Sequence, residues 1–175
     1  MIYLGLDLST SITGATLLDE DGSTLLCEAW DTRNKKQFPT LIHKADYIRN
    51  KILELEYSID KVFIEKPLMF FSRGGSSANV MAMLQNFNGM VSWICWSELN
   101  IEPEHILSGT ARKLSGLKIP RGQKAKEVVL QYFLDNGNEV EYTKHGNPKP
   151  GSYDRADSWV VAKAGYRLWK EESKS

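Results

Sequence analysis

The sequence contains little cysteine and no long apolar run. Only two cysteines occur, Cys27 and Cys95, and neither has a partner at the spacing of metal ligands. We interpret both as buried free thiols in a reducing compartment, which excludes a disulfide scaffold and a zinc module. No apolar stretch approaches the ~18 residues of a membrane span, and no basic segment precedes an apolar one near the start. These absences predict a soluble cytoplasmic protein with no membrane contact.

The chain also lacks a net charge, because 22 lysines and arginines balance 22 aspartates and glutamates. Bulk charge therefore neither favours nor excludes a nucleic-acid partner, and a basic surface would need an uneven distribution of charge. The 175 residues, 42% of them hydrophobic, are enough for one domain with an ordinary core. We expect a single domain over residues 1–170, followed by a charged tail at 171–175.

The order of hydrophobic patterns predicts an α/β fold. The expected strands are 2–8, 12–18, 23–30, 61–65 and 102–106, and the expected helices are 38–57, 78–98, 108–116, 122–135 and 153–170. The stretch at 19–22 predicts a hairpin turn in which Gly22 adopts a positive φ. The fourth strand follows a helix, which predicts a crossover and parallel pairing with the first strand. We expect a mixed five-stranded sheet flanked by helices.

Two of the expected helices carry further predictions. Apolar residues nearly encircle helix 78–98, which indicates burial in the core or at a subunit contact. Ser108 stands at the start of helix 108–116 and is expected to cap it.

Four acidic residues are candidates for a shared site. Asp7 lies in the apolar opening strand, where a lone buried carboxylate is unfavourable, and Glu65 ends the strand expected beside it. Asp154 and Asp157 are three residues apart, on one face of the last helix. Each also has a simpler interpretation: a turn cap for Asp7, a surface acid for Glu65, and an N-cap for Asp154. Together they predict two Mg²⁺ ions, which prefer carboxylates and can promote phosphodiester cleavage.

A basic segment lies between His105 and Lys126, where no acid occurs. Its six cations are Arg112, Lys113, Lys118, Arg121, Lys124 and Lys126. This uneven distribution predicts phosphate contacts, and the simpler interpretation is a solvated helical face. A second acid-free run, residues 144–150, is expected to add contacts.

The loop at 69–77 contains two adjacent aromatic residues. Phe70 or Phe71, if exposed, would wedge between bases at a DNA branch, and Arg73 with the following glycines suits a close approach to phosphates. The alternative is that both rings belong to the core or to a dimer contact.

The segments GLDLSTSITG, FIEKP and DRADSWVVA, in this order and at these distances, resemble the RuvC family of Holliday junction resolvases. This family belongs to the ribonuclease H-like superfamily, and the resemblance covers residues 1–168. It implies a ribonuclease H-like sheet and a homodimer that nicks four-way DNA junctions symmetrically. It also implies two Mg²⁺ ions per active site, replaceable by Mn²⁺, held by four catalytic residues: Asp7, Glu65, Asp154 and Asp157. The spacing from Gly122 to Lys126 matches the basic GxxxK segment of the family, with Lys124 as the near alternative.

The sequence departs from the family pattern at three places. Leu8 and Ser9 replace the usual Pro-Gly, Lys66 and Pro67 follow the acidic strand where Gln is common, and the loop 136–152 is longer. These features resemble those of bacteriophage members. The resemblance implies a wider range of branched DNA substrates and a location in a bacterial or phage-infected cell.

Two other hypotheses belong to different classes of function. An ATP-binding domain of the actin and sugar-kinase type has a similar opening phosphate loop, but the chain is short and a second glycine-rich loop is missing. A non-catalytic binder of branched DNA would not need all four acids.

Overall fold

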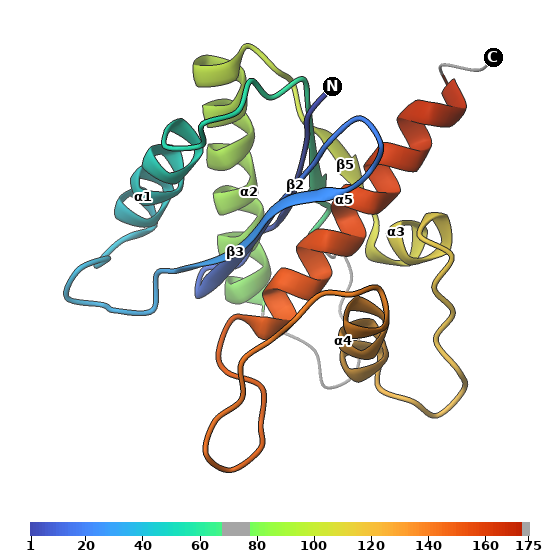
Figure 1. Cartoon of the computed structure of the whole chain (residues 1–175). Coiled ribbons are helices and arrows are strands. Elements are labelled where there is room, and N and C mark those ends of the chain that lie inside the picture. The colour runs from blue at the N-terminus through green and yellow to red at the C-terminus, as the bar shows by residue number, and fades with distance from the viewer. Residues whose placement is uncertain (68–77, 173–175) are drawn as a thin grey trace.

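A five-stranded mixed sheet forms the centre of the computed structural model, which describes residues 1–67 and 78–172 (Figure 1). The strands are β1 (Tyr3–Asp7), β2 (Ile12–Leu18), β3 (Thr24–Asp31), β4 (Lys61–Glu65) and β5 (Glu104–Ile106). Their order in the sheet is β3-β2-β1-β4-β5. The first three strands pair antiparallel, and β4 pairs parallel with both β1 and β5. The predicted parallel crossover is therefore confirmed, as is the hairpin turn, in which Gly22 has a φ of 79°.

In the described part of the chain, five helices lie on the two faces of this sheet. They are α1 (Leu41–Leu53), α2 (Ala78–Leu99), α3 (Ser108–Leu114), α4 (Ala125–Asp135) and α5 (Ser152–Glu172). The helices α1 and α2 cover one face, and α5, with α3 and α4 beside it, covers the other (Figure 1). Within the residues described, no helix is both long and apolar enough to cross a bilayer.

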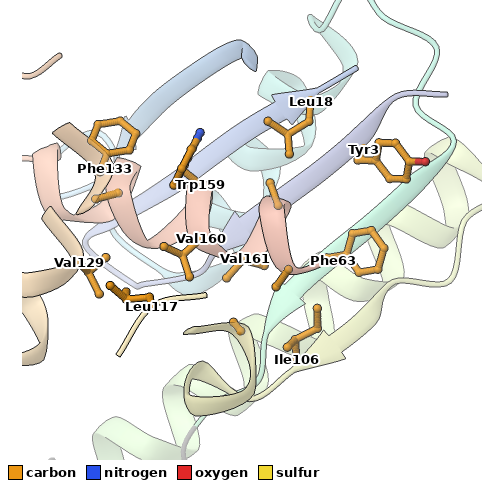
Figure 2. Close-up of a cluster of buried hydrophobic side chains, with 14 of the residues drawn as sticks. Tyr3, Leu18, Phe63, Ile106, Leu117, Val129, Phe133, Trp159, Val160 and Val161 are labelled. Atoms are coloured by element: carbon orange, nitrogen blue, oxygen red, sulfur yellow. The ribbon is translucent and has the colours of Figure 1, made fainter. Parts of the chain in front are cut away.

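Alternate residues of the central strands enter two separate cores, as the period of a strand requires. Leu6 and Ile64 belong to the cluster under α1 and α2. Tyr3 and Phe63 point to the opposite face and belong to the cluster that also contains Trp159, Val160 and Val161 of α5 (Figure 2). The residue that follows Leu6 or Ile64 in its strand must therefore face α5.

Some predicted helix ends are wrong. The helix expected at 38–57 begins at Leu41, because the Thr40 side chain accepts a hydrogen bond from the His43 N–H and caps it. Ser108 does not cap α3: it is the first helical residue, and the extended N-cap residue, Leu107, has no side chain able to accept a hydrogen bond. The last helix continues to Glu172, two residues into the expected tail.

Candidate active site

Two carboxylates stand at the carboxyl ends of adjacent parallel strands. Asp7 is the last residue of β1 and Glu65 is the last residue of β4. The register pairs Leu6 with Ile64, so Asp7 and Glu65 follow side by side. Since Leu6 and Ile64 point to α1 and α2, the two acids point to the α5 face.

The first turns of α5 carry the other two acids, Asp154 and Asp157, to this edge. Gly14 of β2 pairs with Asp7, and a Cβ built on it would lie 1.9 Å from the Asp154 carbonyl oxygen. Only glycine permits this approach of helix backbone to strand backbone. The contact places the start of α5 directly over the strand pair that ends in Asp7.

Asp154 is not the N-cap that one interpretation of the sequence suggested. The N–H of Arg155 donates to the carbonyl of Gly151 over 2.9 Å, so the first turn of α5 already encloses Asp154. Its carboxylate is therefore not required to begin the helix.

Hydrogen bonds fix the rotation of α5 against the sheet. The Oγ1 of Thr16 and the Oγ of Ser158 share a buried hydrogen bond of 2.8 Å. Arg155 Nε donates to the carbonyl of Cys27, and Trp159 Nε1 donates to Thr24 Oγ1, both over 3.0 Å. These contacts use the α5 face that adjoins β2 and β3, and they hold the helix in the orientation that brings its acids to the strand ends.

The four carboxylates, which we call the acidic cluster, affect one another's pKa values. Burial raises the pKa of Asp7 well above its usual range, and the charges of Glu65, Asp157 and Asp154 raise it further. Burial, followed by the charge of Asp157, raises the pKa of Glu65 to about 7. Burial likewise raises the pKa of Asp157 to about 6, with Asp154 adding to the effect. The fold therefore gathers four mutually repelling acids, each half-buried, from β1, β4 and α5.

The donor set of the acidic cluster fits a hard divalent cation. In the part of the chain that the structure describes, no three His, Cys, Asp or Glu side chains are close enough to enclose a metal ion. Carboxylate oxygens are nevertheless the ligands that Mg²⁺ prefers, and a cation would offset the repulsion that raises these pKa values. The strand ends and the first turns of α5 place all four residues at one edge of the sheet, so Asp7, Glu65, Asp154 and Asp157 are the residues that would hold such an ion.

A polar pair supports the end of β4 from the α2 side. Asn88, which is buried within α2, donates from Nδ2 to the carbonyl of Glu65 over 3.3 Å. His105 Nε2 lies 2.8 Å from Asn88 Oδ1. Asn88 was not predicted from the sequence, although a polar residue among the inward positions of an apolar helix is an available signal.

Two residues of the basic segment, residues 112–126, lie near the acidic cluster. The charge of Arg112 lowers the pKa of Glu65 and of Asp157, against the larger effect of burial. The charge of Lys126 acts in the same direction on Asp157, and its ammonium lies 4.0 Å from the centre of the Tyr153 ring.

The other predicted cations of this segment are exposed: Lys113, Lys118, Arg121 and Lys124. None of the six makes an ion pair with another described residue. The predicted DNA contacts Phe70, Phe71 and Arg73 lie outside the described residues.

Comparison with solved structures finds a similar fold in two RuvC structures. The structure of Thermus thermophilus RuvC in complex with Holliday junction substrate has a TM-score of 0.69 and 16% sequence identity, with 98% of this chain and 96% of that chain covered. A second Thermus thermophilus RuvC structure has a TM-score of 0.65 and 16% identity, with coverages of 98% and 97%. No family model and no curated protein sequence matches the chain. The likeness to RuvC and the ribonuclease H-like α/β fold are therefore confirmed as a matter of fold.

Proposed function

We propose that this protein is a metal-dependent endonuclease that resolves Holliday junctions and other branched DNA by symmetric nicks. The observation that carries the proposal is the gathering of Asp7, Glu65, Asp154 and Asp157 at one edge of a RuvC-like sheet. Gly14 permits the close approach of α5 to this edge. Holding four acids close together in a half-buried site is unfavourable unless a cation offsets their charge.

The acidic cluster would hold two Mg²⁺ ions, or Mn²⁺ in their place. When bound, such ions supply a water of lowered pKa and stabilise charge on the leaving oxygen of a phosphodiester. Asp7 and Glu65 would bind from the strand ends, and Asp154 and Asp157 from α5. We expect products with 5′-phosphate and 3′-hydroxyl ends.

The basic segment 112–126 would hold the phosphate backbone next to the cut. Arg112 and Lys126 are the members that act electrostatically on the acidic cluster, which supports Lys126 over Lys124 as the lysine nearest the scissile phosphate. Phe70 or Phe71 would wedge at the branch point, with Arg73 on a nearby phosphate.

A homodimer would match the two-fold symmetry of a four-way junction. The candidate contact is the outer face of α2, where Trp93 and Trp96, one turn apart, are 66% and 54% exposed. A second copy of the chain would cover both indoles and place two acidic clusters on one junction. We place this activity in the cytoplasm of a bacterial or phage-infected cell, where DNA branches form.

The test is cleavage of a labelled four-way junction, a Y-fork and a linear duplex in Mg²⁺, with Asp7→Asn as the matched variant. We expect paired nicks on branched DNA and a loss of about 10³-fold or more in Asp7→Asn, because a metal-held charge contributes several kcal/mol to the transition state. Binding measured in Ca²⁺ should persist in the variant.

Three results would overturn the proposal. Equal cleavage by the wild type and Asp7→Asn would refute the metal site. Tight junction binding by an inactive wild type would leave a non-catalytic binder, whereas a nucleotide-dependent thermal shift without DNA binding would favour the ATP-binding class.

A further inference from the structure

The segment between β3 and α1 is basic, and it is separate from the basic segment 112–126. Residues 32–45, which we call the β3–α1 segment, contain no aspartate or glutamate. Their cations are Arg33, Lys35, Lys36 and Lys44. Lys35 and Lys36 are exposed and form no ion pair with any described residue. An unbalanced charge of this kind on a neutral protein favours an anionic partner.

The topology places the β3–α1 segment at the same edge of the sheet as the acidic cluster. Both β1 and β3 run antiparallel to β2, so β3 ends at the edge where Asp7 and Glu65 lie. At the other side of the sheet, β5 ends at this edge too and leads into α3. In Figure 1 the light blue β3–α1 segment lies on one side of the start of α5, and α3 and α4 lie on the other. The acids therefore lie between two basic segments.

Electrostatics agree with this placement. Burial raises the pKa of Asp154 and the charge of Asp31 raises it further, whereas the charges of Lys126 and Arg33 lower it. Lys126 acts from the α4 side and Arg33 from the β3 side, so a cation of each basic segment acts electrostatically on the same carboxylate. Arg33 is itself oriented by Asp31, with 2.6 Å between Nη2 and Oδ2.

The start of α1 adds to the positive charge of the segment. The first turn of α1 contains no acidic residue, and it carries His43 and Lys44 where a negative charge would normally balance the helix dipole. The ammonium of Lys44 donates to the carbonyl of Thr10, in the loop that follows Asp7. This hydrogen bond links the β3–α1 segment to the loop between β1 and β2, which begins next to Asp7.

We propose that the β3–α1 segment binds the phosphate backbone of a second duplex arm of branched DNA, across the acidic cluster from the segment 112–126. This inference rests on the proposed function. Neighbouring strands are ~4.8 Å apart, so β3 and β5, which are four spacings apart, are separated by ~19 Å. Two arms can therefore be held on opposite sides of the acids, and the strand that passes from one arm to the other crosses the cluster.

The experiment compares K35E/K36E with a matched double variant, K61E/K170E. Lys61 begins β4 and Lys170 lies in the last turn of α5, at the opposite edge of the sheet. Both variants change the net charge equally. Kd is measured in Ca²⁺ for a four-way junction and for a linear duplex of one arm, from about 50 to 200 mM salt.

We expect K35E/K36E to bind the junction about tenfold more weakly, with the slope of log K against log salt smaller by about 1.8, as for two lost phosphate contacts. Binding of the linear duplex should change less than twofold, as should both affinities of K61E/K170E. The neutral double variant K35Q/K36Q should lose part of the junction affinity that K35E/K36E loses. The melting temperatures of all variants show whether they fold.

Each contrary result has its own meaning. Junction binding by K35E/K36E equal to that of K61E/K170E overturns this inference and leaves the proposed function standing. An equal loss on junction and duplex overturns the assignment to a second arm. A wild type with no preference for the junction refutes the proposed function, and the inference fails with it.

Discussion

The helices on the two faces of the sheet contact it in different ways. On one face α5 lies against the strands nearly backbone to backbone: a Cβ on Gly5 would lie 2.5 Å from the nitrogen of Ala162, and one on Gly14 would lie 1.9 Å from the Asp154 oxygen. On the other face, large apolar side chains such as Ile48 of α1 and Phe87 of α2 fill the space between helix and sheet.

This difference agrees with the catalytic role that we propose for the α5 face. Catalytic groups need placement to within about half an ångström, and a contact through glycine leaves a helix little freedom to shift. An apolar layer of side chains can repack at small cost, so it suits a face that only has to be covered. The helix that carries Asp154 and Asp157 is the closely docked one, and the helix that exposes Trp93 is not.

Among the substitutions that test this difference, Gly14→Ala should have the largest effect on stability and cleavage, because it forces α5 away from β2. Overpacking at a backbone contact costs about 1–3 kcal/mol of the free energy of unfolding. Displacing Asp154 by about 1 Å should also lower junction cleavage by about 10²-fold. Thermal unfolding and single-turnover cleavage measure the two effects separately.

Gly89→Ala, on α2, is the control for that variant. Among the residues that the structure describes, no atom outside the adjoining part of α2 lies within 4 Å of a Cβ at Gly89, so alanine should stabilise the helix by about 0.5–1 kcal/mol. Equal destabilisation by the two substitutions would refute the difference between the faces.

Replacing Trp93 and Trp96 with glutamate should separate the proposed dimer. The two indoles lie on the exposed side of α2, so charges there would oppose association without entering the core. Light scattering should report the mass of a monomer. The melting temperature of the variant in EDTA should be close to that of the dissociated wild type. Cleavage of the junction should give single rather than paired nicks. A variant of unchanged mass would place the dimer contact elsewhere.

Glu65→Gln should stabilise the fold when metal is absent. The pKa of Glu65 is about 7 in the fold against an ordinary 4.5, so the folded state binds the proton more tightly than the unfolded chain. The free energy of unfolding then falls as pH rises from about 4.5 to about 7, and it stays low above that. With EDTA, the variant should melt above the wild type at pH 8 and close to it at pH 4.5.

The exposed acid Glu56 provides the control, since Glu56→Gln should leave that pH profile unchanged. Mg²⁺ should raise the melting temperature of the wild type more than that of Glu65→Gln. If the difference in melting temperature between the wild type and Glu65→Gln did not depend on pH, the inference that the acidic cluster raises the pKa of Glu65 would be wrong.

Strands were predicted more accurately than helix ends. The bounds of β2 and β4 agree with the expected 12–18 and 61–65, because alternation and flanking turns are local signals. The Ser108 cap was wrong because the preceding turn, and not the residue type, decides where the first helical hydrogen bond forms. Arg33 and Asn88 were missed because their relevance depends on which strand or helix lies beside them.

The sequence alone determined the class of fold, the order of its elements and the four acids as a candidate set, since strand period, helix spacing and unusual carboxylates are local properties of the chain. Only the tertiary structure decided that the four acids share one environment. Their repulsion depends on parallel pairing of β1 with β4 and on a helix seated on Gly14, more than 130 residues away in the chain. Contacts between such distant segments arise from packing, which no local pattern encodes.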